Sequence, residues 1–106
     1  MTFSVKPGVE ISGLHLEMLD AVPKIARVFA AFGYDATVTS GRDGDHMPGS
    51  LHYAGKALDW RTWEDDRGTQ IRASVKERIA EEIAREVGPR FDVVPEATHI
   101  HVELDA

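Results

Sequence analysis

The chain contains no cysteine. This absence excludes disulfide bonds, thiolate nucleophiles and cysteine-ligated zinc, so any bound metal must be held by His, Asp or Glu side chains. Long apolar runs are also missing. A membrane-spanning helix needs about 20 consecutive apolar residues, and no stretch of the sequence approaches that length. We therefore expect no membrane span.

Basic residues are in the minority, with 12 Lys and Arg against 18 Asp and Glu and a net charge of -6. With no basic run, such a chain would repel phosphates, which argues against nucleic-acid binding. The N-terminal segment 1–8 lacks the basic start and apolar stretch of a signal peptide, so we expect a cytoplasmic protein or one delivered to the cell wall by a phage. The 106 residues suit a single domain over 1–106, expected to be monomeric.

Two segments have the apolar spacing of amphipathic helices. The first ends at Gly33. Its apolar residues recur at steps of three and four and are Leu14, Met18, Val22, Ile25, Phe29 and Phe32. Pro23 lies inside it and predicts a kink or two shorter helices. The second ends at Gly88, and its apolar residues recur at steps of four: Ile71, Val75, Ile79, Ile83 and Val87. Lys76 and the other charged residues of this segment are predicted to face solvent.

Short β-type segments lie between and after these helices. They cover residues 36–39, 57–60, 91–94 and 98–104, and the last two are expected to form a hairpin. Residues 40–49 are rich in glycine and predict a surface loop over a site. The order of elements predicts an α+β fold in which a small antiparallel sheet packs against two main helices.

Imidazoles and carboxylates gather in two of these segments. His52 and Asp59 are seven residues apart, on either side of a possible turn that leads into a strand. His99 and His101 are two apart, which places both imidazoles on one face of a strand, about 7 Å from each other. Two imidazoles and one carboxylate suit Zn²⁺ and leave a fourth position for water. One of the two strand histidines can then bind metal while the other faces the substrate, and Glu96 has the position of a general base.

The motif Ser-x-His-x-x-Gly-x-Ala-x-Asp occurs at Ser50, His52, Gly55, Ala57 and Asp59, and residues 98–103 read Thr-His-Ile-His-Val-Glu. In these residues the chain resembles the zinc peptidases of the D-alanyl-D-alanine carboxypeptidase type, which share their fold with the amino-terminal signalling domain of hedgehog. The resemblance to the hedgehog domain is especially close. It covers about residues 38–103 and implies the same fold.

The resemblance implies that His52, Asp59 and His101 hold zinc, and that Glu96 and His99 assist the attacking water. Some relatives use a Glu-x-x-His spacing that would make His99 the ligand. We favour His101, because His-x-His sites in this superfamily generally bind through the second histidine.

The resemblance also implies substrate contacts. In related peptidases a Ser-Gly-aromatic-Arg segment holds the substrate carboxylate, and Arg42 follows a corresponding segment that is one residue shorter. His46 would line the cleft, and Ser50 would contact substrate. The implied activity is zinc-dependent hydrolysis of peptide bonds in bacterial peptidoglycan stem peptides, of the D-Ala-D-Ala carboxypeptidase or L-Ala-D-Glu endopeptidase type. The alternative is a catalytically inactive, zinc-stabilised binding module of the hedgehog type.

Overall fold

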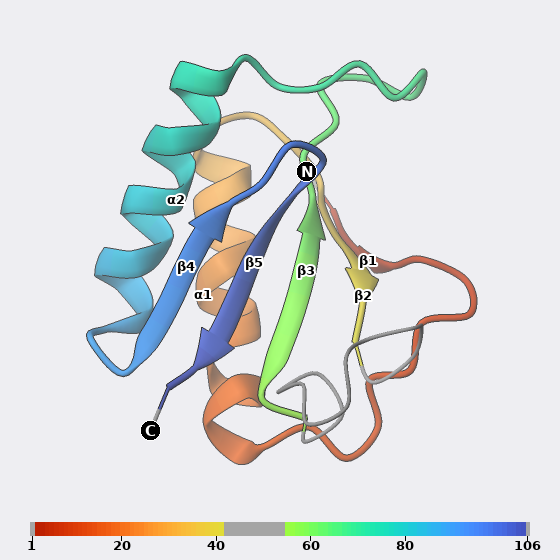
Figure 1. Ribbon diagram of the computed structural model, residues 1–106. Coiled ribbons are helices and arrows are strands. Elements are labelled where there is room, and N and C mark those ends of the chain that lie inside the picture. The colour runs from red at the N-terminus through yellow and green to blue at the C-terminus, as the bar shows by residue number, and fades with distance from the viewer. Residues whose placement is uncertain (1, 42–54, 106) are drawn as a thin grey trace.

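The computed structural model describes residues 2–41 and 55–105, which form an α+β fold (Figure 1). In chain order the elements are β1 (Phe3–Val5), α1 (Leu16–Ala31), β2 (Ala36–Ser40), β3 (Ala57–Arg61), α2 (Ala73–Val87), β4 (Phe91–Pro95) and β5 (His99–Leu104). Both predicted helices are present, and the four predicted strands are found within one or two residues of their expected ends. Strands β4 and β5 form the expected hairpin.

The five strands form one mixed sheet in the order β1-β2-β3-β5-β4. Strands β2, β3, β5 and β4 pair antiparallel, whereas β1 pairs parallel to β2. The prediction of a purely antiparallel sheet is therefore wrong at this edge. Strand β1 has only three residues and is mostly exposed, so it carries no alternating pattern that sequence spacing could detect.

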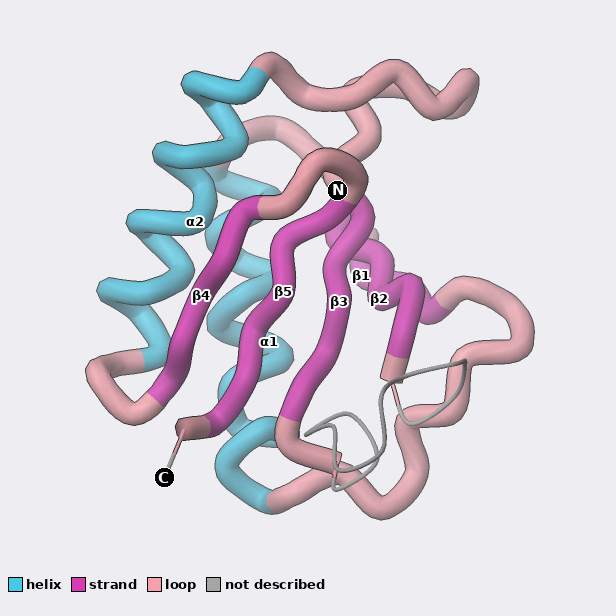
Figure 2. Tube along the Cα trace, viewed as in Figure 1, coloured by secondary structure: helices cyan, strands magenta, loops and turns pink. Residues whose placement is uncertain are grey.

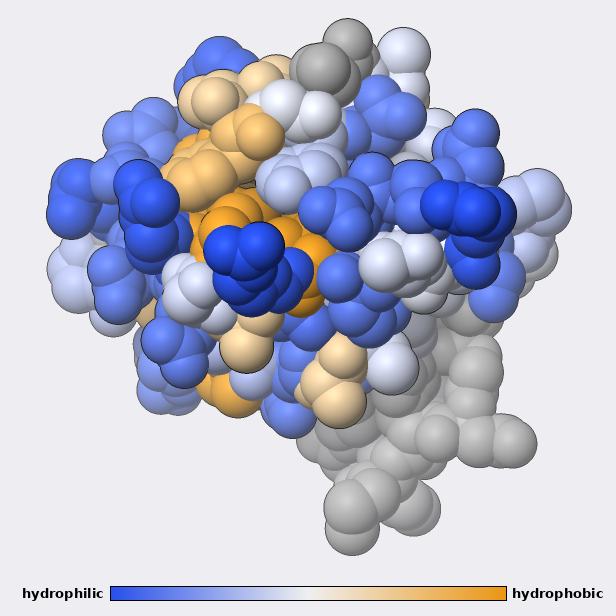
Figure 3. All heavy atoms as spheres, turned by 90° about the horizontal axis from the view of Figure 1, so that it is seen from above, coloured by the Kyte–Doolittle hydropathy of each residue, from blue (hydrophilic) through white to orange (hydrophobic). Residues whose placement is uncertain are grey.

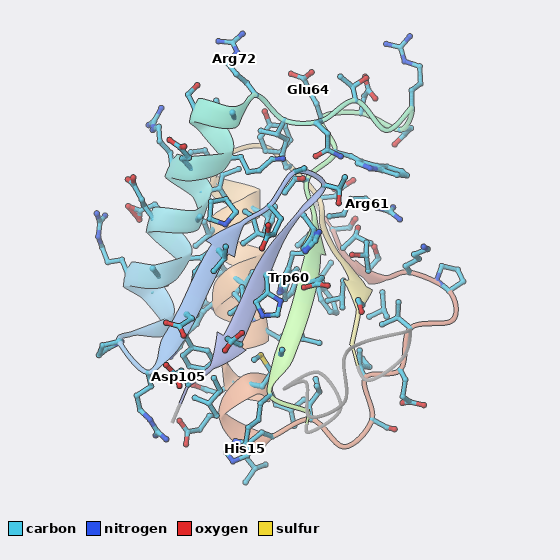
Figure 4. All side chains as sticks on the ribbon, in the orientation of Figure 1. His15, Trp60, Arg61, Glu64, Arg72 and Asp105 are labelled. Atoms are coloured by element: carbon cyan, nitrogen blue, oxygen red, sulfur yellow. The ribbon has the colours of Figure 1, made fainter. Side chains whose placement is uncertain are left out.

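Both helices lie on the same face of the sheet, behind the strands in the view of Figure 2. The core fills the space between helices and sheet. Trp60 of β3 is fully buried there and stacks on Phe29 of α1, with ring centroids 6.1 Å apart. Figure 4 shows Trp60 at the middle of the sheet, with Arg61 towards one end and His15 and Asp105 at the other. The opposite face of the sheet carries polar side chains of β3 and β5 that alternate with the buried residues.

Helix α1 is a single helix from Leu16 to Ala31, with Pro23 inside it. Of the two predicted alternatives, a kink or two shorter helices, the second is therefore wrong. Pro23 lies on the exposed side of α1, so water can bond to the carbonyl of Leu19 that the missing N–H leaves without its helical donor. The buried face of α1 contains Met18, Ile25 and Phe29, as their spacing predicts.

The prediction that Lys76 of α2 faces solvent is wrong, because this residue is only 6% exposed. A helix turns about 400° in four residues, so a stripe drawn at steps of four drifts by about 40° at each step. The buried face follows steps of three and four instead and contains Lys76, Ile79, Ala80 and Ile83. The ammonium group donates hydrogen bonds to Gln70 Oε1 at 3.2 Å and to the carbonyls of Glu96 and Ala97 at 3.1 and 3.0 Å.

Figure 3 views the end of the molecule where α2 begins and the β4–β5 turn lies, with a hydrophobic area bordered by hydrophilic side chains. A hollow of about 380 Å³ at this end is lined by Gln70, Ile71, Ala73, Lys76, Glu77, Pro95, Glu96 and Ala97.

In the described part of the chain, neither helix combines the length and apolar character that a membrane crossing requires.

Candidate functional site

The candidate site lies on the face of the sheet that points away from the helices. Along β5, Ile100, Val102 and Leu104 are buried, while the alternate residues His99, His101 and Glu103 are half-buried. Along β3, Leu58 and Trp60 are buried and Asp59 and Arg61 are half-buried. Because neighbouring side chains of a strand point to opposite faces, the core residues of β3 and β5 hold the polar set in place from behind.

Asp59 and His101 are directly opposite each other in the antiparallel pairing of β3 with β5. The carboxylate oxygen Oδ1 of Asp59 lies 2.8 Å from Nδ1 of His101 and 3.7 Å from Nε2 of His99. The side chain of Asp59 is 14% exposed, so this contact is well shielded from water. The two strands thus bring one carboxylate and two imidazoles to one place.

A second carboxylate contacts the same imidazole. Oε1 of Glu103, two residues along β5, lies 2.7 Å from Nε2 of His101. A carboxylate only accepts hydrogen bonds, so an imidazole held between two of them carries a proton on each nitrogen. The hydrogen bond with Asp59 is the main cause that raises the pKa of His101 to about 9, against the opposing effect of burial and with help from Glu103.

Further negative charge surrounds this group. Asp92 of β4 pairs with Glu103 of β5 in the sheet register. Desolvation, a hydrogen bond shared with Asp105, and repulsion from Asp105 and Glu103 together raise the pKa of Asp92. The negative charges that raise the pKa of Asp92 also attract cations, so the electrostatics of this face favour a positively charged ligand.

The turn between β4 and β5 carries Glu96. Its backbone N–H donates to the carbonyl of His99 at 2.7 Å, and its side chain is exposed. The hydrogen bonds of Lys76 to the carbonyls of Glu96 and Ala97 anchor this turn to α2. Glu96 therefore lies at the His99 end of the site, on a turn whose backbone is fixed from inside the molecule.

Arg61 pairs with His99 across β3 and β5 and borders the site at the same end. Its guanidinium lies over the ring of Trp63, 3.8 Å from the ring centroid. A cavity of about 150 Å³ opens beside this pair, lined by Gly33, Tyr34, Asp35, Thr37, Arg61, Trp63, Glu64, Asp65 and Asp66. Asp59 and His101 do not line this cavity.

Four of the predicted site residues, Arg42, His46, Ser50 and His52, lie outside the described residues. The structure begins again at Gly55, whose φ of +73° is one that other residues rarely adopt. A Cβ at this position would be 2.5 Å from the carbonyl oxygen of Gly13, and the Gly55 carbonyl accepts a hydrogen bond from the N–H of His15. The glycine of the motif therefore has a structural role, in the close approach of two backbones.

The donor chemistry of Asp59 and His101 fits a zinc ion, because a carboxylate oxygen and an imidazole nitrogen lie side by side in a shielded place. The two atoms now share a hydrogen bond, so an ion would take the place of the proton between them. Within residues 2–41 and 55–105, no group of three or more His, Asp or Glu side chains is arranged to hold a metal. The described residues thus include two of the three predicted ligands, Asp59 and His101, in contact with each other.

Sequence reasoning missed Glu103 as a member of this group. A signal was available, because residues 99, 101 and 103 alternate along one strand and must share a face.

Comparisons of the chain with protein-family models, with curated proteins and with solved structures give no match.

Proposed function

We propose that the protein is a zinc-dependent peptidase that hydrolyses peptide bonds in peptidoglycan stem peptides, with the hedgehog and D-Ala-D-Ala peptidase type of fold. The observation that carries the proposal is the pairing of Asp59 with His101 across β3 and β5, which brings two donors of the predicted set to 2.8 Å from each other. His52, from the sequence motif, is the proposed third ligand.

Bound zinc would make a water molecule acidic near neutral pH and polarise the scissile carbonyl. Asp59 and His101 would supply the fixed donors, held by strands whose other face is the core. Glu96 or His99 would take the proton of the attacking water and return it to the leaving amine. His99 is suitably close for this task, since its Nε2 is 3.7 Å from the Asp59 carboxylate.

The substrate-contacting residues are proposed from the sequence motifs and from the residues that border the site. Arg42 would hold a substrate carboxylate, with His46 and Ser50 lining the same cleft. At the His99 end, the site is bordered by the guanidinium of Arg61 and by the partly exposed ring of Trp63 that it covers.

The test is to incubate zinc-loaded protein with purified peptidoglycan and to identify released termini by mass spectrometry. The expected result is release of D-Ala or of a new D-Glu amino terminus by the wild type, abolished in Asp59→Ala. The matched control is Asp20→Ala, which removes an exposed carboxylate on α1, on the helix side of the sheet and away from the site. Zinc uptake with a raised melting temperature and no product would instead indicate the hedgehog-type binding module. Absence of zinc uptake would contradict both.

A further inference from the structure

We infer that Glu103 is a positioning residue for the metal centre: it holds the Nε2–H of His101, so that Nδ1 is the nitrogen directed at the ion beside Asp59. This inference deepens the proposed function and rests on it for the identity of the ion. The two contacts that carry it are Glu103 Oε1 to His101 Nε2 at 2.7 Å and Asp59 Oδ1 to His101 Nδ1 at 2.8 Å.

The directions of the ring nitrogens decide which one faces the ion. The two nitrogens of an imidazole point in diverging directions, so Asp59 and Glu103 lie on different sides of the ring. An ion shared by Asp59 and His101 must lie on the Asp59 side of the ring, where Nδ1 is the nitrogen that can bind it. Glu103, bonded to Nε2, is then on the far side of the ring and does not bind the same ion.

The backbone of β5 places the two residues on the same face of the sheet. His101 and Glu103 flank Val102, which is fully buried, and Val102 pairs with Leu58 of β3 and Val93 of β4. The strand therefore fixes the backbone from which the imidazole and the carboxylate extend. Metal-ligating histidines usually donate their second N–H to a carboxylate or carbonyl, which orients the ring and makes it a stronger donor to the ion.

The first measurement needs no metal. In metal-free protein, nitrogen-detected NMR of the His101 ring should find an Nε2–H protected from exchange with water. Glu103→Ala should lose this protection, whereas Glu103→Gln should keep part of it, since its amide oxygen still accepts a hydrogen bond. An unprotected Nε2–H in the wild type overturns the inference whether or not the protein binds zinc.

The second measurement is the Zn²⁺ dissociation constant, from competition with a chromophoric chelator. Glu103→Ala should raise it about 10- to 100-fold and Glu103→Gln by less. Asp92→Asn is the matched control, because it alters a neighbouring carboxylate on β4 that is paired in register with Glu103. It should change zinc affinity far less than Glu103→Ala does.

The outcomes separate the inference from the proposed function. A wild type that binds no zinc contradicts the proposed function, and the exchange measurement then decides the role of Glu103 alone. A wild type that binds zinc with an affinity equal to that of Glu103→Ala overturns the inference. Zinc found on Nε2 of His101 in the loaded protein does the same, and both results leave the peptidase proposal standing.

Discussion

Asp59 of β3 and His101 of β5 face each other across an antiparallel pair, with Oδ1 and Nδ1 2.8 Å apart. The backbone pairing places these two residues opposite each other, whereas Nε2 of His99 approaches the same carboxylate only to 3.7 Å. The two strand histidines are therefore expected to differ in function.

His101→Ala should lower zinc affinity by orders of magnitude, because a proposed ligand is removed. His99→Ala should keep the zinc and lose turnover by about 10²-fold, the usual effect of deleting a proton-transfer group. Glu96→Gln should resemble His99→Ala. Elemental analysis and peptidase assays of the three variants check this. If His99→Ala empties the site and His101→Ala leaves it full, the Glu-x-x-His spacing describes the ligand instead.

Stability of the metal-free protein should fall as the pH rises from about 6.5 to about 9. Contact with Asp59 raises the pKa of His101 to about 9 in the folded state. A raised pKa gives stability that is complete below the unfolded value of about 6.5 and is lost as pH passes the folded value. The loss should be about 1 to 3 kcal/mol, discounted for the 21% exposure of the side chain. Urea unfolding with a chelator measures it, and His101→Gln should flatten the profile.

Lys76→Met should destabilise the protein by about 1 to 3 kcal/mol, because the part-buried hydrogen bonds of its ammonium group to the carbonyls of Glu96 and Ala97 are lost. The same replacement of a cation at Arg85, which is exposed on α2, should cost under about 0.5 kcal/mol. Chemical denaturation of the two variants gives the comparison. Equal costs would mean that the hydrogen bonds of Lys76 contribute little net stability.

Gly55→Ala should cost more stability than Gly33→Ala. Both glycines have positive φ, +73° and +89°, so both variants suffer the left-handed strain of about 1 to 2 kcal/mol. Only at Gly55 would the new Cβ also meet a backbone oxygen, that of Gly13 at 2.5 Å, while nothing lies within 4 Å at Gly33. Thermal unfolding of the pair isolates the close approach. A smaller loss at Gly55 would show that the Gly13 segment moves away without cost.

The sequence predicts most of the fold because most of its elements have clear periodicity. The buried faces of α1 and β5 follow from the spacing of Met18, Ile25 and Phe29 and from the alternation of residues 100, 102 and 104. Strand β1 has no such pattern, and its pairing with β2 is decided by the tertiary structure. The burial of Lys76 is not predictable from its charge, which favours exposure. A lysine can be buried where carbonyl acceptors lie within reach, as those of Glu96 and Ala97 do here.

Part of the candidate site is also predictable, and for a physical reason. Asp59 and His101 belong to predicted strands, and the structure brings them into contact. The contact of Glu103 with His101 depends on side-chain directions that motif spacing does not contain. Arg42, His46, Ser50 and His52 stay predictions, since they lie outside the described residues.

Strand β5 contributes to the core with one set of residues and to the candidate site with the other. Deleting or inserting a single residue within it would exchange the two sets, turning imidazoles and a carboxylate inward and aliphatic side chains outward. A change of length in this strand would therefore disrupt both the packing of the core and the candidate site. Variation among homologous chains should accordingly occur here only by substitution, with insertions and deletions confined to the connecting turns.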